Sequence, residues 1–280
     1  MAQNNTAIDV EIFARTALRF AAKRRALAPD AVATLTEDLV QGLARLTRPV
    51  GGGAQAPKVG ANDPGIPQDS LAQFCAALVQ PHPEAALDFV QSRRAEGMTR
   101  HEVYLGYIAA AARQLGEGWD QNRFSLTEVT IGSGHLYALM RALRAEAQAR
   151  PAYDARKCAL FAVVPGEDHG IGITVAADLF REAGWEIDLQ LATDHAGLLA
   201  RAERTLPPVV GLSLSSPVRV PALARLVLAL RLALPHAVIG VAPAAGLDAM
   251  RLDGLLDVDL VLGDADTARA ELERRIAPPR

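Results

Sequence analysis

The sequence predicts an all-α N-terminal part followed by an α/β C-terminal part, and three observations support this prediction. After Pro151, five short apolar runs alternate with segments of helix length, which is typical of a parallel sheet with helices on both faces. Between about residues 69 and 149, every segment has helical periodicity and the turns are short. A stretch rich in Gly and Pro separates these parts from two amphipathic helices at the N-terminus.

The chain is predicted to divide into an N-terminal helical extension (1–47), a flexible linker (48–68), a helical bundle cap (69–150) and an α/β domain (151–280). With 280 residues, half of them hydrophobic, it is long enough for two domains. The extension carries a basic segment, residues 14–25, which is either a solvated face or a surface for a protein partner or DNA.

Helix-end signals define the predicted bundle. The helix that starts near residue 84 should end before Gly97. Thr99 with Glu102, and Ser125 with Glu128, have the spacing of capping boxes, so each pair should start a new helix. The first of these helices should reach roughly residue 116. Four helices in about 80 residues predict an all-α four-helix bundle.

The five apolar runs predict a flavodoxin-like, or Rossmann-like, five-stranded parallel sheet. Such sheets bind ligands beyond the carboxyl ends of their strands. The predicted strands are residues 158–164, 186–191, 209–215, 237–241 and 258–263.

The charge balance excludes a strongly basic protein. The sequence has 29 Lys and Arg against 32 Asp and Glu, a formal charge of -3. General attraction to nucleic acid is therefore absent, and any contact with DNA would be weak, local or indirect.

The compartment is predicted to be the cytoplasm. The two cysteines, Cys75 and Cys158, lie far apart in the sequence and have no metal-site spacing, which fits a reducing environment. The N-terminus does not resemble a signal peptide, and no apolar run approaches the roughly 18–20 residues that span a bilayer. We therefore expect no membrane contact.

A histidine in the loop after the first predicted strand is the main candidate site residue. His169 follows Glu167 and Asp168, and Gly170 and Gly172 leave the backbone accessible. A carboxylate near a metal-bound imidazole fixes its tautomer and strengthens the donor nitrogen. Taken alone, a histidine at this place is also compatible with a surface residue or a helix cap.

The spacing of three sequence elements resembles the signature of cobalamin-binding domains. The pattern Glu167-x-His169-x-x-Gly172 is followed by forty residues and then Ser213, and Gly240 comes 27 positions later. The first element of the family pattern is usually Asp-x-His-x-x-Gly. Since the three elements should all lie at or near the strand ends, they are expected to converge on one rim of the sheet.

This resemblance implies a role for each element. His169 would be the lower axial ligand of cobalt, in place of the dimethylbenzimidazole base. The released nucleotide tail would enter a slot formed by Ser213 and by Gly240 with Val241. The family's Ser-x-Leu reads Ser213-Leu214-Ser215 here, and its Gly-Gly reads Gly240-Val241. The changes to Ser215 and Val241 are expected to reshape the slot and to leave the imidazole in place.

The predicted bundle carries a second resemblance. Residues 115–130 are similar to the cap of methionine synthase and of light-sensing MerR-type regulators, in which a tryptophan shields the upper face of cobalt, and Trp119 matches it. Those regulators have a Glu-His pair where this chain has Val129 and Thr130. The nearest substitute for an upper ligand is His135. Trp119 as a core aromatic, and His135 with another partner, remain open alternatives.

The run W-x₅-S-L-x-x-V-T-x-G, residues 119–132, resembles the AerR/PpaA-type photosystem antirepressors of purple bacteria, with similarity over roughly residues 70–275. The resemblance implies a cobalamin-dependent, light-responsive transcriptional regulator, and no enzyme. Its cofactor would be adenosyl-, methyl- or hydroxocobalamin. Its partner would be a photosystem-gene repressor of the CrtJ/PpsR type.

Other functions remain possible at this stage. A corrinoid methyl carrier of a methyltransferase system also joins a helical cap to a cobalamin domain. An adenosylcobalamin mutase needs a barrel of about 250 residues, for which this chain has no room. A receiver-like signalling domain would need a lysine after the last strand, which is absent here. Heme is the secondary cofactor candidate, because His169 would ligate either metal.

Overall fold

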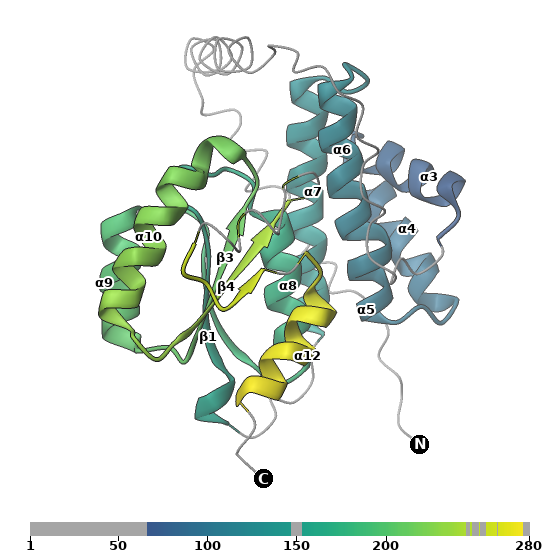
Figure 1. Cartoon of the computed structure of the whole chain (residues 1–280). Helices are drawn as coiled ribbons and strands as arrows, with labels where there is room; N and C mark the ends of the chain where they lie inside the picture. The colour runs from purple at the N-terminus through teal and green to yellow at the C-terminus, as the bar shows by residue number, and fades with distance from the viewer. Residues whose placement is uncertain are drawn as a thin grey trace, which may run out of the picture.

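The structure, a computed structural model, describes residues 66–146, 153–244, 247, 252, 256–261 and 263–276. The predicted extension (1–47) and nearly all of the predicted linker (48–68) lie outside these residues. Figure 1 shows a helical bundle beside an α/β unit. The bundle consists of α3 (Gln68–Leu78), α4 (Glu84–Ala95), α5 (Arg100–Glu102), the π-helical segment η1 (Val103–Ala109), α6 (Ala110–Asp120) and α7 (Leu126–Ala145).

The predicted helix starts in the bundle are confirmed. The side chains of Thr99 and Ser125 each accept the backbone N–H three residues later, and the glutamates at those positions complete both capping boxes. Gly97 has a φ of 98°, which ends α4 in the left-handed conformation that glycine adopts without strain. The helix predicted to stop near residue 116 instead continues to Asp120, and it ends where Asn122 adopts a φ of 56°. Trp119 is therefore a helical residue.

The predicted five-stranded parallel sheet is also confirmed. Its strands are β1 (Cys158–Val163), β2 (Glu186–Gln190), β3 (Val209–Leu214), β4 (Val238–Pro243) and β5 (Leu260–Val261). They lie in the order β2-β1-β3-β4-β5, and all neighbours are parallel. This order is that of flavodoxin-like sheets.

Helices cover both faces of the sheet, as Figure 1 shows. The helices α9 (His195–Thr205) and α10 (Val220–Ala233) lie on one face. The helices α8 (Ile171–Glu182) and α12 (Ala265–Ile276) lie on the other. Alternate residues of the central strands enter the two cores: Val210 and Leu212 face α10, whereas Phe161 and Val209 face α8 and α12.

The helix α8 is buried on two sides, which the sequence analysis did not predict. The helical spacing of Val175, Leu179 and Phe180 in the sequence predicts that all three pack against the sheet. In the structure only Phe180 belongs to the sheet core, while Val175 and Leu179 belong to the core of the bundle. The bundle and the α/β unit therefore share one helix.

The bundle packs beside the sheet, and one end of it projects beyond the strand ends. Figure 1 shows α6 and α7 rising past the carboxyl ends of β3 and β4. Tyr137 on α7 lies next to Gly170, at the level of the rim. Leu126, at the start of α7, is eleven residues earlier, so about 16 Å of helix extends past this level. No helix within the described residues combines the length and the apolar character needed to cross a bilayer.

Candidate functional site

His169 lies in the loop that joins β1 to α8, at the carboxyl end of the sheet. Its side chain is 81% exposed, so the imidazole is accessible to a ligand. The loop turns at Gly166, which has a φ of 86°. An added Cβ at Gly166 would lie 2.7 Å from Nη1 of Arg219, so this guanidinium packs directly on the turn. The histidine is thus exposed, and the turn that precedes it in the loop is packed against Arg219.

Glu167 anchors this loop to the segment that follows β3. Its side chain is 3% exposed. Its Oε1 accepts hydrogen bonds from the backbone N–H of Ser215 and of Ser216, both at 3.1 Å, and its Oε2 accepts the hydroxyl of Ser215. A buried carboxylate with these three donors is fully compensated, and it fixes two loops relative to each other.

Ser215 and Glu167 also surround one nitrogen of the imidazole. The Nδ1 of His169 lies 3.3 Å from Oγ of Ser215 and 4.0 Å from Oε2 of Glu167. These groups can hold a proton on Nδ1, which leaves the lone pair on Nε2 for a metal. Glu167, the predicted carboxylate partner, thus lies near the histidine. Ser215, which was predicted to reshape the slot for the nucleotide tail, instead contacts Glu167 and His169 in the loop. Asp168 is exposed between them, and the structure shows no hydrogen bond from its side chain within the described residues.

The two loop glycines differ in their surroundings. A Cβ at Gly170 would lie 2.9 Å from Oη of Tyr137 and 3.2 Å from Leu191, so any other residue would force these side chains to shift. A Cβ at Gly172 would meet nothing within 4 Å. Gly170 therefore allows the bundle to approach the loop, and Gly172 leaves open space beside the histidine.

Ser213 and Gly240 lie on the same face of the sheet but at different distances from the carboxyl ends of the strands. Ser213 pairs with Ala242, whereas Gly240 pairs with Gly211. Because β4 continues to Pro243, Gly240 lies two residues, or about 7 Å, below the level of Ser213. Gly240, predicted at or near the end of its strand, instead lies in the middle of β4. Both residues face the α8 and α12 side.

Small side chains occupy this part of the sheet face. Ser213 and Gly240 are half-buried and Ala242 is exposed. A Cβ at Gly240 would meet its nearest neighbour only at 3.8 Å, which is ordinary contact. Val241 points to the opposite face, where it is 2% exposed in the core under α10. The structure thus brings Ser213 and Gly240 together and separates Val241 from them.

The predicted residues of the bundle do not all face the rim. Trp119 and Val129 are partly exposed, near the projecting end of α6 and α7. His135 is 6% exposed and lies between α7 and α3, where its Nδ1 donates to the carbonyl oxygen of Leu78 at 2.8 Å. Burial lowers the pKa of His135, although this hydrogen bond opposes the effect. His135 therefore has another partner, the carbonyl oxygen of Leu78, as the alternative to an upper ligand predicted.

The residues present fit a corrin better than a bare metal ion. Within the described part of the chain, no group of three or more His, Cys, Asp or Glu side chains is placed to hold a metal ion. A corrin supplies four nitrogen ligands to its cobalt, so it needs only one axial nitrogen from the protein. His169 offers that nitrogen, beside open space at Gly172.

Comparison with known proteins supports cobalamin binding by the α/β part of the chain. Residues 157–273 match the family model described as the B12 binding domain. This part of the chain is similar to B12-binding domains. The match includes the loop with His169, all of β1 to β5 and most of α12. The bundle residues Trp119 and His135 lie outside it.

Two further similarities extend the comparison. An uncharacterized 20.5 kDa protein in the bchF-crtJ intergenic region of Rhodobacter capsulatus is 34% identical over 104 residues, 35% of this chain and 52% of that protein. The chain thus spans about half the length of this curated relative. The monomethylamine corrinoid protein of Methanosarcina barkeri has a similar fold, with a TM-score of 0.59 and 14% identity over 74% of this chain and 99% of that one.

Three residues around the loop that carries His169 were missed by sequence reasoning. Ser216 and Arg219 follow β3 and act through a backbone N–H and through packing, neither of which leaves a pattern in one sequence. Tyr137 comes from α7, more than thirty positions earlier. A tyrosine at the helical spacing of the bundle's apolar residues gave no indication that it would reach another domain.

Proposed function

We propose that the chain is a cobalamin-dependent, light-responsive regulator of transcription, with His169 as the lower ligand of cobalt. The observation that carries the proposal is the exposed imidazole backed by Glu167 and Ser215 within a B12-binding domain. When bound, an alkylcobalamin would supply a cobalt–carbon bond that light can break.

The chain's own residues would contact the cofactor in three places. Glu167 and Ser215 would orient the imidazole of His169 and keep its proton on Nδ1. The small side chains around Ser213 and Gly240 would leave space for the nucleotide tail along the sheet face. The projecting ends of α6 and α7, with Trp119 and Val129, would border the upper face.

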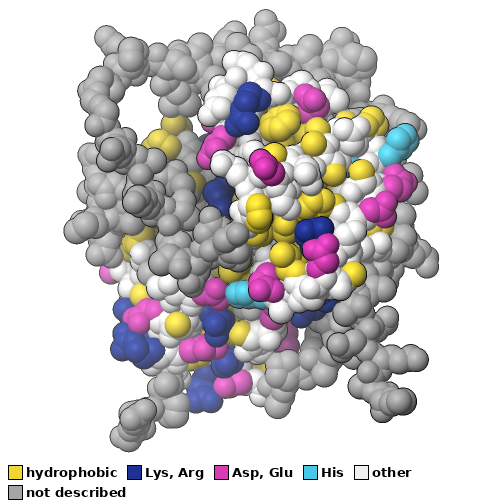
Figure 2. Space-filling model, turned by 90° about the vertical axis from the view of Figure 1, so that its right-hand side faces the viewer, with side chains coloured by type: hydrophobic (Ala, Val, Ile, Leu, Met, Phe, Trp, Pro, Cys, Tyr) yellow, Lys and Arg dark blue, Asp and Glu magenta, His cyan; other side chains and the backbone are white. Residues whose placement is uncertain are grey.

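The regulatory part of the proposal has separate support. The relative from Rhodobacter capsulatus is described by its place between bchF and crtJ, and crtJ names the kind of repressor that we propose as the partner. Figure 2 shows the bundle side of the molecule, where positive and negative side chains are interspersed with hydrophobic ones. Such a surface suits a protein partner better than the continuous positive charge that DNA requires. We therefore propose a repressor of the CrtJ/PpsR type as the partner, and no enzymatic activity.

The test of cofactor binding is the substitution H169A. Purified protein is mixed with hydroxocobalamin, and its absorption spectrum is compared with that of the wild type and of H236A, which removes an exposed histidine elsewhere. We expect H169A to keep its circular dichroism spectrum and to lose the base-off cobalamin spectrum, while H236A keeps both. An unchanged spectrum for H169A would refute the ligand assignment.

A corrinoid methyl carrier is the second candidate, because the fold of the bundle and domain resembles the monomethylamine corrinoid protein. The two functions differ in what they do with a methyl group. A regulator loaded with an alkylcobalamin should change its affinity for the purified repressor after illumination. A carrier should exchange its methyl group with a methyltransferase in the dark and show no effect of light on repressor binding.

A further inference from the structure

A buried carboxylate joins the B12-binding domain to the helical bundle. Asp178 lies on the side of α8 that faces the bundle, next to Val175 and Leu179, and is 2% exposed. A charge at such a place is costly unless several donors surround it. Its partners therefore show which parts of the molecule depend on it.

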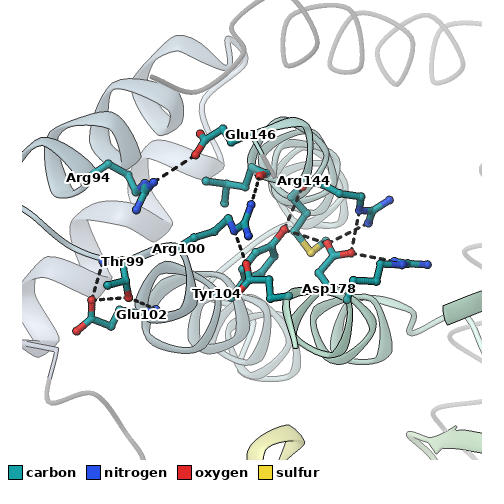
Figure 3. Close-up of polar contacts among 12 residues, drawn as sticks. Arg94, Thr99, Arg100, Glu102, Tyr104, Arg144, Glu146 and Asp178 are labelled. Carbon is teal, nitrogen blue, oxygen red and sulfur yellow. Dashed lines mark hydrogen bonds and ion pairs between the residues drawn. The ribbon is translucent and has the colours of Figure 1, made fainter. Parts of the chain in front are cut away.

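The bundle supplies most of these partners, as Figure 3 shows. Arg144 on α7 binds Asp178 through two nitrogens, Nε to Oδ1 at 2.8 Å and Nη2 to Oδ2 at 3.0 Å. Tyr104 in η1 donates its hydroxyl to Oδ2 at 2.9 Å. Arg181 of α8 itself adds a bond to Oδ1 at 2.9 Å. The carboxylate is thus shared between one donor from its own helix and two elements of the bundle.

The contact with Tyr104 comes from an irregular part of the bundle. Tyr104 is 1% exposed and is the second residue of the π-helical segment Val103–Ala109. Burial raises the pKa of Tyr104, and the charge of Asp178 raises it further, so the hydroxyl stays protonated and donates. Single π-helical turns interrupt regular helices and often lie at functional sites.

More exposed contacts surround this central one. Arg100 binds Glu182, one turn further along α8, and its Nη1 donates to the carbonyl oxygen of Leu143 at 3.2 Å. His101 lies 3.2 Å from a carboxylate oxygen of Asp266 on α12. These pairs are partly exposed and contribute less than a buried one. Asp178 is therefore the main polar link.

The other end of α8 leads directly to the cofactor loop. Gly170 is the N-cap of α8 and follows His169 in sequence. Asp178 is eight residues from Gly170, about 12 Å along the helix axis. Tyr137, two turns before Arg144 on α7, lies against Gly170 at the same time. The two helices thus touch at the loop and are fastened together at Asp178.

We infer that Asp178 is a positioning residue for the His169 site, which acts through Arg144 and Tyr104 to fix α7 beside the cofactor loop. When the link is broken, α7 can move relative to α8, and the contact of Tyr137 with Gly170 loosens. The loop that carries His169 then loses one of its supports. Only the cofactor part of the test below rests on the proposed function.

The test uses the full chain without cofactor and hydrogen–deuterium exchange. The variants are D178N, the more exposed partner variant R144Q, and the control D188N, which removes an ion pair with Arg201 on the opposite face of the sheet. In D178N and R144Q we expect exchange to be about tenfold faster both in η1 and in residues 165–174, a change that corresponds to about 1.4 kcal/mol in local opening. Exchange in β3 should be unchanged, and D188N should match the wild type in all three segments.

Two results would overturn the inference. Faster exchange in η1 with an unchanged loop would mean that Asp178 has only a local role. Faster exchange everywhere, β3 included, in both variants would mean that it only stabilises the fold. If D178N does not fold, R144Q decides between these outcomes.

A second measurement uses hydroxocobalamin as the probe. We expect D178N and R144Q to release it about tenfold faster than the wild type, with an unchanged absorption spectrum because His169 is intact. An unchanged release rate with a faster-exchanging loop would contradict the positioning role. If the wild type itself does not bind hydroxocobalamin, the proposed function fails, and the exchange measurements on cofactor-free protein still decide the role of Asp178.

Discussion

Replacing Glu167 separates its structural role from its effect on His169. In E167A, the backbone N–H groups of Ser215 and Ser216 lose their acceptor, and both bonds are 3.1 Å long in the structure. Each of these part-buried donors costs about 1 kcal/mol when it loses its partner, the low end of the range for buried groups, because solvent partly reaches it. The two together predict that E167A lowers the free energy of unfolding by about 2 kcal/mol.

The variant E167Q should behave differently. Its side-chain carbonyl oxygen can still accept both N–H groups, so we expect the free energy of unfolding to change by less than about 1 kcal/mol. The imidazole of His169 nevertheless loses its negatively charged neighbour. Loss of such a partner typically weakens metal binding by about 10–100-fold, which is about 1.4–2.8 kcal/mol.

Two assays on the same samples measure these effects. Chemical denaturation gives the free energy of unfolding, and titration with hydroxocobalamin followed by absorbance gives the dissociation constant. E167D is the matched control, because it keeps the charge and restores the aspartate that is usual in the family pattern. If E167Q binds hydroxocobalamin as tightly as the wild type does, the carboxylate does not tune the imidazole and the reasoning is wrong.

Three further predictions concern other positions. G240V should fold and bind cobalamin more weakly than the wild type does. It should bind cobinamide, which lacks the nucleotide tail, as tightly as the wild type does. The contrasting variant G211A should lose about 1–3 kcal/mol of stability, because its Cβ would lie 2.8 Å from a phenylalanine ring on β1. The pKa of His135 is lowered by burial, so below about pH 6.5 the unfolded chain binds a proton that the folded chain does not. Stability should therefore fall as the pH drops through this value, by at most about 1.4 kcal/mol per pH unit, and H135N should show a shallower pH dependence in thermal unfolding. G118A should destabilise the end of α6, because its Cβ would lie 2.2 Å from the ring of Phe124, and tryptophan fluorescence should report the change at a lower temperature than in the wild type.

Much of the fold was predictable because local signals and global architecture agree. The capping boxes at Thr99 and Ser125 start helices by short-range hydrogen bonds, which depend only on neighbouring residues. The apolar runs that form β1, β3 and β4 have little polar alternation, and the run in β1 is buried on both faces. Their spacing by helical segments leaves a parallel sheet as the natural arrangement.

What the sequence did not predict depends on contacts between distant segments. The spacing of the apolar residues in α8 predicts a single apolar face against the sheet, yet Val175 and Leu179 pack on the bundle. The aspartate between them, flanked by apolar residues, was the available signal, since a buried carboxylate needs partners. Its partners Tyr104 and Arg144 are too far away in the sequence to be found by spacing.

The different depths of the two predicted site elements bear on the choice between cobalamin and heme. His169 lies on the loop above β1, whereas Gly240 lies about 7 Å below the level of Ser213 on the same face of the sheet. A flat tetrapyrrole bound to His169 would reach the rim only, and the small side chains below it would have no role. A ligand with a tail would use both levels. The register of β3 and β4 therefore favours cobalamin. The affinities of G240V for cobalamin and for cobinamide measure the contribution of the tail directly. If G240V binds both ligands more weakly by the same factor, this argument fails and heme is an equal candidate.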